Sequence, residues 1–309
     1  AYDAFDRAGA EIEQMPITRQ VSRTLVFDRL DAYKDRVTPE LVGRFAGETF
    51  DTPAPAFLVG FPRSGTTMTE QVIAAHPGVV TSDQLLDPMG RRLMEGADQR
   101  YDVPGQLAKL DKPLVEELRR IYWDRVADQI DEDTAGKLFL DKLPLNIIDL
   151  PMINTIFPDA KVIVALRDPR DCCLSCFMQY FRPNPAMVHL LRLPSTVNFY
   201  AAVMGHHLGT RGSLTLPSLE VRYEDTVSDL ESQGRRIIDH LGLDWDDGLL
   251  HFQEKARARA IRTPSYEAVT EKVHTRAIGR WANYRAHFEP LAEKLGPFLS
   301  AFGYSTSAS

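Results

Sequence analysis

The sequence predicts an α/β protein with three layers, in which a central, mainly parallel sheet is flanked by helices. Two observations lead to this fold class. Short apolar runs alternate along the chain with longer segments of helical periodicity, which is the pattern of strands joined by crossover helices. Charged or proline-containing turns follow the apolar runs, as expected where parallel strands end at one edge of a sheet.

Residues 1–50 are expected to form a helical N-terminal extension. Apolar positions recur there at helical spacing, as in VSRTLVFDRLDAYKDRV (residues 21–37). The proline-marked turn DTPAPA (51–56) then leads into the first strand. Because no internal repeat or linker is visible after it, residues 51–309 are interpreted as one domain.

Four strand passages are expected within that domain. They are FLVGFPRSGTTMTEQVIAAHPGV (57–79), KLFLDKLP (137–144), AKVIVALRDPRD (160–171) and LEVRYEDTVSD (219–229). The first passes through a glycine-flanked loop into an amphipathic helix, and the third is the strongest apolar run. Strands spaced by helical segments favour a parallel sheet with helices on both faces.

Composition narrows the possible partners. The 309 residues include 44% hydrophobic and 26% charged residues, which is ordinary for a soluble globular protein. The net charge of -7 disfavours nonspecific binding to nucleic acid or to an anionic membrane. No segment approaches the roughly 18 unbroken apolar residues of a membrane span, and no signal peptide pattern opens the chain. The sequence begins at Ala1, so a removed leader or an upstream domain stays open.

The first strand passage is similar to the phosphate-binding loop G-x-x-x-x-G-K-[ST]. Gly60 and Gly65 occupy the two glycine positions and Thr67 occupies the Ser/Thr position, whereas Thr66 replaces the lysine. The fold is therefore expected to be of the P-loop type. Without that lysine, phosphoryl transfer of the usual kind is poorly supported.

The same loop carries further groups that bind anions. A strand, a tight turn and a helix start point several backbone N–H groups at one anion. Ser64, Thr66 and Thr67 add hydroxyl donors, and Arg63 supplies a planar, permanently charged guanidinium. A strand–turn–helix with chance glycines is the alternative, and it leaves this concentration of anion-binding groups unexplained.

A second anion site is predicted from LRDPRDCCLSCFMQYF (166–181). Arg167 leaves the carboxyl end of a strand, the edge where open α/β sheets bind ligands, and Ser175 follows about two helical turns later. Considered without the first loop, Arg167 is equally compatible with a surface ion pair. Considered together with that loop, Arg167 and Ser175 predict a ligand with phosphate groups at two separate places. ATP differs, because its phosphates form one chain.

The three cysteines, Cys172, Cys173 and Cys176, lie within five residues of one expected helix. A disulfide framework would spread its cysteines along the chain, and no Cys or His pair with zinc-ligand spacing lies nearby. We therefore expect the three cysteines to be buried packing residues with free thiols. Free thiols are typical of a reducing compartment, so a cytoplasmic location is expected.

Together these motifs resemble the sulfotransferase superfamily. FPRSGTT (61–67) is similar to the family's 5′-phosphosulfate loop, and Arg167 with Ser175 is similar to its 3′-phosphate motif. The branch of tyrosylprotein sulfotransferases, and of bacterial sulfotransferases that often follow tetratricopeptide repeats, is the most similar. The resemblance runs from about Phe57 to Leu291 with the motifs in the family order. It includes DKLPLN (141–146), FPDAKVI (157–163), RDPRDCCLSCF (167–177) and GRWANYRAHFEPL (279–291).

The resemblance implies that residues 51–309 form a sulfotransferase domain. Its donor would be 3′-phosphoadenosine 5′-phosphosulfate (PAPS) and its product adenosine 3′,5′-bisphosphate (PAP), with no metal. An acceptor hydroxyl or amine would attack sulfur in line. The resemblance does not identify the acceptor, which could be a small molecule, a glycan, a lipid or a protein tyrosine. A homodimer is also compatible with it. MQYFRPNPAMVHLLRLP (178–194) is expected to line the acceptor side.

The resemblance also assigns residues. Arg63 and Lys142 would stabilise the transferring sulfuryl group, with a solvated loop lysine as the alternative for Lys142. Tyr223 resembles a tyrosine near the adenine, or is a half-buried core tyrosine. The segment 265–281 resembles a loop that closes over the donor, in which Trp281 either contacts the purine or anchors the loop. The donor-binding residues implied in all are Arg63, Ser64, Gly65, Thr66, Thr67, Arg167, Ser175, Tyr223, Ser265 and Arg280.

The catalytic base departs from the family pattern. In tyrosylprotein sulfotransferases a glutamate follows the His-Pro after the loop helix, whereas here His76-Pro77 is followed by GVVTSDQLLDP, which places Gln84 at that position. An amide is not a useful proton acceptor, so Asp83 is expected to take the role. Three alternatives stay open. Asp83 could instead be an N-cap or loop residue, His189 could be the base, or the acceptor could need little deprotonation.

Two other classes of function remain as alternatives. A P-loop kinase or NTPase would bind ATP with magnesium, but Thr66 in place of the lysine speaks against it. A non-catalytic nucleotide-binding protein is favoured by Gln84 alone.

Overall fold

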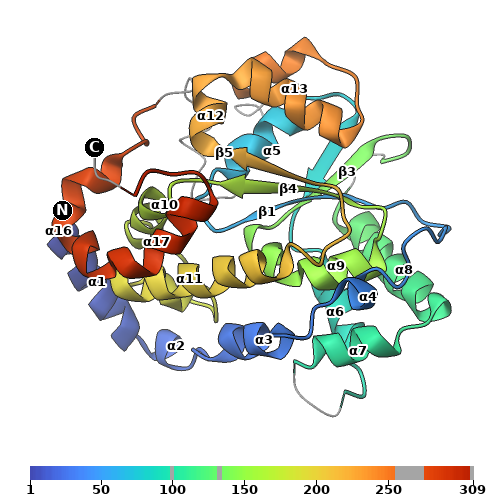
Figure 1. Cartoon of the computed structure of the whole chain (residues 1–309), viewed down its shortest axis with the longest axis horizontal. Coiled ribbons are helices and arrows are strands. Elements are labelled where there is room, and N and C mark those ends of the chain that lie inside the picture. The colour runs from blue at the N-terminus through green and yellow to red at the C-terminus, as the bar shows by residue number, and fades with distance from the viewer. Residues whose placement is uncertain (98–100, 131–133, 255–274, 307–309) are drawn as a thin grey trace.

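The computed structural model describes residues 1–97, 101–130, 134–254 and 275–306 (Figure 1). Within these residues the strands form a five-stranded sheet in the order β2-β3-β1-β4-β5, and every neighbouring pair is parallel. The prediction of an α/β fold with a mainly parallel sheet is therefore confirmed. The strands are β1 (Ala56–Gly60), β2 (Val79–Ser82), β3 (Leu138–Lys142), β4 (Lys161–Leu166) and β5 (Ser218–Arg222).

The central strand β1 is buried along its whole length and pairs with β3 and β4. Its side chains alternate between two hydrophobic clusters, with Phe57 and Val59 in one and Ala56 and Leu58 in the other. A strand that is covered on both faces needs apolar residues at every position. This explains why the first strand reads as a continuous apolar run.

Helices cover both faces of this sheet and complete the three layers. α5 (Thr66–Ala74) and α13 (Leu230–Leu241) lie on one face, and α9 (Leu150–Ile156) and α11 (Leu193–Thr210) lie on the other (Figure 1). Each face has its own hydrophobic cluster, so the sheet is packed on both sides.

The other helices surround these layers. None of the helices in the described part of the chain is long and apolar enough to cross a membrane. Their bounds are α1 (Tyr2–Gln14), α2 (Pro16–Arg19), α3 (Leu25–Tyr33), α4 (Pro39–Val42), α6 (Leu86–Leu93), α7 (Val103–Lys109), α8 (Lys112–Gln129), α10 (Pro169–Phe177), α12 (Tyr223–Ser228), α16 (Arg285–Phe288) and α17 (Ala292–Ala301). The 3-10 helices are η1 (Pro144–Asp149), η2 (Met187–Leu190), η3 (Asp247–His251), η4 (Arg280–Tyr284) and η5 (Glu289–Leu291).

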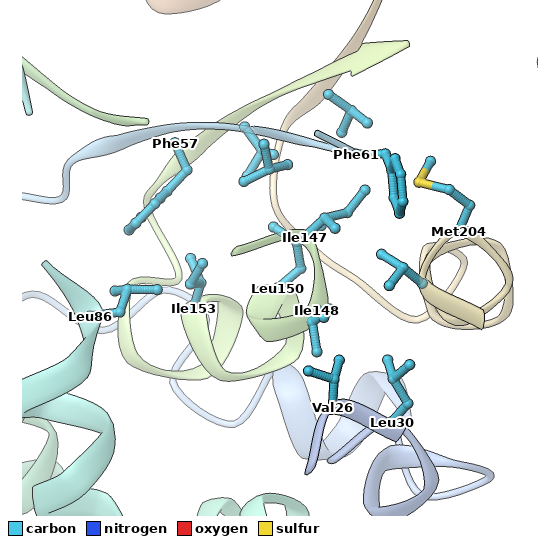
Figure 2. Packing of buried hydrophobic residues seen from close by; sticks show 14 of the residues in the cluster. Val26, Leu30, Phe57, Phe61, Leu86, Ile147, Ile148, Leu150, Ile153 and Met204 are labelled. Atoms are coloured by element: carbon cyan, nitrogen blue, oxygen red, sulfur yellow. The ribbon is translucent and has the colours of Figure 1, made fainter. Parts of the chain in front are cut away.

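The helices of residues 1–50 share their packing with the α/β layers. Val26 and Leu30 of α3 belong to the same hydrophobic cluster as Phe57, and Figure 2 shows Val26 directly below Ile148 of η1. Arg192 Nε donates to Asp6 Oδ1 at 2.8 Å, which joins α1 to the start of α11. The N-terminal helices therefore lie against the elements that follow the strands.

The carboxyl ends of the parallel strands bring the predicted motifs to one edge of the sheet. β1 leads into the loop of residues 61–65, and Lys142 is the last residue of β3. Arg167 follows β4, and Tyr223 follows β5. Because all these strands run in the same direction, the four features lie at the same edge, where open α/β sheets bind their ligands.

Candidate functional site

The predicted phosphate loop connects β1 to α5 and depends on its two glycines. Gly65 has a φ of 102°, and a Cβ there would lie 3.0 Å from Cδ2 of Tyr223. At Gly60, an added Cβ would lie 2.5 Å from the carbonyl oxygen of Ala165. Larger residues at these positions would displace the loop from β4 and from Tyr223, which follows β5.

Two cysteine thiols support this loop from α10. Cys172 and Cys176 each donate from Sγ to the carbonyl oxygen of Pro62, at 3.2 and 3.1 Å. The cysteines are free and buried, as the sequence predicted, and burial raises the pKa of the Cys172 thiol. Their contact with the loop was missed, because it depends on how α10 packs beneath it.

The two predicted anion motifs meet in the structure. Arg63 Nε donates to Ser175 Oγ at 3.0 Å, and Arg167 Nη1 donates to the carbonyl oxygen of Arg63 at 3.2 Å. The Arg167 guanidinium also lies over the ring of Tyr223, 4.8 Å from its centre. Four predicted residues from three distant segments thus form one connected group.

Positive charge is concentrated at this junction. Arg63 is half-buried and Arg167 is buried, although both carry a guanidinium. Burial lowers the pKa of Arg63, and the neighbouring charge of Arg167 lowers it further. An anionic ligand would favour the charged form of both side chains.

Buried polar groups surround the loop. Ser64 Oγ and Arg167 Nε are buried and make no hydrogen bond with the described residues. Thr66 and Thr67 are buried in the first turn of α5, where backbone N–H groups have no intrahelical acceptor. Buried polar groups are normally paired, so these residues fit an anion at the start of α5.

Lys142 lies at the same edge and is held by carboxylates. Its Nζ is 3.1 Å from Glu70 Oε2 and 3.9 Å from Asp83 Oδ2. The Lys142 side chain is only 5% exposed, which contradicts the alternative of a solvated loop lysine. Burial raises the pKa of Glu70, and the charge of Lys142 opposes that effect.

Glu70 was missed by the sequence analysis. It lies one helical turn after Thr66, on a helix in which every residue is buried. A carboxylate on a buried helix needs a cationic partner, and that rule alone indicates that Glu70 faces a lysine or an arginine.

The expected base and its alternatives occupy different surroundings. The side chain of Asp83 is 45% exposed and lies beside Lys142. Gln84, at the family's glutamate position, has a φ of 61°. His189 is buried between aromatic rings, with ring centres 5.0 Å from both Phe27 and Phe199, and burial lowers its pKa. The structure therefore places Asp83, and not His189, in contact with the buried lysine.

The predicted donor-closing segment is described in part. Ser265 lies outside the described residues, and Arg280 is exposed at the start of η4. Trp281 is an anchor, because it is buried and its backbone N–H donates to Asp171 Oδ1 at 2.8 Å. Arg167 Nη2 also donates to the carbonyl oxygen of Ala277 at 2.7 Å, so this segment reaches the anion junction.

A second carboxyl group missed from the sequence is Asp141, directly before Lys142. It is fully buried in β3, where the hydroxyl of Tyr122 donates to Oδ2 at 3.2 Å. Its Oδ1 has no partner among the described residues. Burial raises the pKa of Asp141 to about 7, against a normal value of 3.8, and the charge of Asp83 contributes to the increase.

Asp141→Asn is expected to flatten the pH dependence of stability. Because the pKa is raised in the folded protein, the folded state binds this proton more tightly than the unfolded chain does. The resulting stabilisation is complete below about pH 4 and is lost as the pH rises through about 7. The fall in unfolding free energy between pH 5 and 8 should therefore be smaller in the variant by roughly 2–3 kcal/mol.

Urea denaturation at pH 5 and pH 8 measures this difference. Asp124→Asn, at an exposed position of α8, is the matched control and should keep the pH dependence of the unchanged protein. Equal pH dependence in Asp141→Asn and in the unchanged protein would show that Asp141 is not the buried titrating group.

Comparison with known proteins indicates the family of the chain. A sequence profile of the sulfotransferase family matches residues 55–247. An uncharacterized protein of Aquifex aeolicus is 27% identical over 269 residues, which cover 84% of this chain and 34% of that protein, so the chain spans about a third of its length. Protein-tyrosine sulfotransferase 1 of Danio rerio is 24% identical over 289 residues, which cover 82% of this chain and 72% of that protein.

The fold is similar to that of a solved sulfotransferase domain. The sulfotransferase domain from the Synechococcus PCC 7002 olefin synthase superposes with a TM-score of 0.56 at 21% identity, covering 84% of this chain and 99% of that domain. The family profile extends from β1 past α13 and includes the loop, Lys142, and the Arg167 and Ser175 motif. The chain belongs to the sulfotransferase family.

Proposed function

We propose that the protein transfers a sulfuryl group from PAPS to a hydroxyl or amine of an acceptor and releases PAP. The observation that supports this donor is the junction of the two anion motifs, in which Arg63 contacts both Ser175 and Arg167. PAPS carries a 5′-phosphosulfate and a separate 3′-phosphate. A site with two linked cationic groups, each with its own hydroxyl donors, matches that charge distribution.

The residues at the loop would hold the 5′ end of the donor. Arg63, Ser64, Thr66 and Thr67 offer charge and hydroxyl groups there, and the N-terminus of α5 offers backbone N–H groups. Ser64 Oγ is buried without a partner among the described residues, which fits a ligand oxygen at that position.

The 3′-phosphate would be held by Arg167 and Ser175. Arg167 Nε is also buried without a described partner, and Ser175 already lies within hydrogen-bond distance of Arg63. Tyr223, under the Arg167 guanidinium, offers a ring face for the nucleotide. Ser265 and Arg280 are kept as proposed donor contacts on the closing segment.

Catalysis would depend on positive charge held at the end of β3. The donor supplies the sulfuryl group, and negative charge develops on the oxygen that leaves with PAP. Arg63 and Lys142 would stabilise this charge, and both lie in surroundings that exclude much of the water. Glu70 positions the ammonium group of Lys142, and Asp83 would accept the proton of the acceptor.

A cytoplasmic location is part of the proposal. It is supported by three free, buried cysteines within one helix, which fit a reducing compartment.

Arg63→Ala and Lys142→Ala are each expected to lower kcat for transfer from PAPS to phenol by about 100-fold or more, because each removes charge that stabilises the leaving oxygen. Circular dichroism and thermal unfolding should show that both variants stay folded. Lys109→Ala, at an exposed position of α7, should keep normal turnover. Near-normal kcat in either site variant would refute the role assigned to that residue.

Asp83→Asn is expected to lower kcat by about 100-fold, the usual contribution of a general base, while PAP binding stays unchanged. Steady-state kinetics from pH 5 to 9 with calorimetric PAP titration tests both effects. If kcat is retained, the proton is accepted by another group.

A further inference from the structure

A large cavity has among its lining residues the direct sequence neighbours of the proposed base and of the catalytic lysine. Its volume is about 1020 Å³, at the upper end of the roughly 300–1,000 Å³ usual for pockets that enclose drug-sized ligands. Gln84 and Leu143 line one part of it, and they directly follow Asp83 and Lys142 in the chain. An acceptor bound in this cavity would therefore have one end near the proposed base and the catalytic lysine.

The cavity has a polar group close to that end. Asn146 of η1 lines it, is only 3% exposed, and its Nδ2 has no hydrogen-bond partner among the described residues. A buried amide that donates no hydrogen bond is costly unless a ligand oxygen accepts one. Asn146 is therefore placed to hold an oxygen of the acceptor.

The remainder of the cavity is mainly apolar. Its walls come from α3, α6, η1, α9 and the start of η2, and they include Val26, Leu86, Met152 and Met187. Figure 2 shows two of these lining residues, Val26 of α3 below Ile148 of η1 and Leu86 of α6 beside Ile153 of α9. Methionine side chains adapt to irregular apolar ligands, so these walls suit an apolar body more than a polar chain.

The charges along the cavity are largely compensated. Arg29 and Asp149 both line it and form an ion pair with each other. Asp87 and Arg91, of opposite sign, are exposed at α6. The charges of these four residues sum to zero. This disfavours an acceptor that is recognised through many charges.

We propose that the acceptor is a small amphipathic alcohol or phenol, whose hydroxyl lies near Asp83 and Lys142 and whose uncharged apolar body fills this cavity. The inference rests on the proposed function. In the reaction, a bond forms between the acceptor oxygen and sulfur, and the bond between sulfur and the bridging phosphate oxygen of PAPS breaks. The hydroxyl proton passes to Asp83, and the electron pair leaves with PAP.

A protein tyrosine fits this cavity less well. Its ring would occupy only a small part of the volume, and the peptide backbone would need hydrogen-bond partners that apolar walls do not provide. The wall from α3 lies outside residues 55–247, the region that the family profile matches. Acceptor selection is therefore assigned in part to the N-terminal helices.

Gly90 allows a direct test by filling the cavity. It lines the cavity on the same face of α6 as Leu86 and Met94, each one turn away, and a Cβ added there meets no atom within 4 Å. The backbone at Gly90 therefore leaves room for the Cβ of a side chain, and the ring of Gly90→Phe is expected to occupy part of the cavity. Replacing a helical glycine does not weaken the helix. Gly209→Phe is the matched control, because Gly209 is an exposed glycine of α11 with equally open surroundings.

The experiment measures the binding of three probes to the PAP-saturated protein: phenol, 4-octylphenol and a tyrosine-containing octapeptide. We expect 4-octylphenol to bind at least about 50-fold more tightly than phenol, because the cavity buries its alkyl chain. Gly90→Phe should weaken 4-octylphenol by at least about 10-fold and leave phenol and PAP unchanged, whereas Gly209→Phe should match the unchanged protein.

The outcomes separate the two proposals. No PAP binding would refute the proposed function before any acceptor is added. PAP binding together with equal affinity for phenol and 4-octylphenol, or with tighter binding of the octapeptide, would overturn the amphipathic acceptor alone. The comparison of probes on the unchanged protein decides this even where Gly90→Phe fails to fold.

Discussion

The site depends on the contact between two arginines that come from different strands. Arg167 donates to the backbone of Arg63, and Arg63 in turn donates to Ser175, so the loop after β1 and the helix after β4 are fixed to each other. Two like charges in partly buried positions oppose this arrangement. The fold maintains it through glycines at the ends of the loop and through the thiols that hold Pro62. A dianionic or more highly charged ligand would relieve the repulsion, which supports the proposed donor site at this junction.

The lysine at the end of β3 is surrounded by opposite charges, whereas the two arginines have like charges close together. Lys142 is buried, and Glu70 and Asp83 surround it with negative charge, which keeps the ammonium group in one place. The two carboxylates differ in exposure, at 11% for Glu70 and 45% for Asp83. Only the more exposed one is accessible to an acceptor from solvent, so Glu70 is best understood as a positioning residue. Gln84 at the family's glutamate position is then compatible with catalysis, because a carboxylate remains beside the lysine.

Much of the fold and of the anion site followed from the sequence, because those features depend on local patterns. A buried parallel strand, a glycine-bounded loop and an arginine at a strand end each leave a signature within about ten residues, and parallel strands place their ends together. Arg63, Arg167 and Ser175 were brought together in this way, whereas Tyr223 was indicated by the family resemblance alone.

Other parts of the site could not be read from local patterns. The contact of Cys172 with Pro62, the pairing of Glu70 with Lys142 and the buried Asp141 depend on which helix packs against which strand. The cavity is built from segments between residues 25 and 187, so no single stretch of sequence indicates it. Its composition becomes visible only when α3 is seen against η1 and α6.

The most direct test of the account is a calorimetric titration of the unchanged protein with PAP, compared with AMP and with ATP plus magnesium. The account predicts tight binding of PAP and weakening by at least about 100-fold when the 3′-phosphate is absent, because Arg167 and Ser175 then lose their ligand. Equal affinity for PAP and AMP would contradict the two-anion site. Preference for ATP with magnesium would show instead that the loop after β1 serves a different nucleotide chemistry.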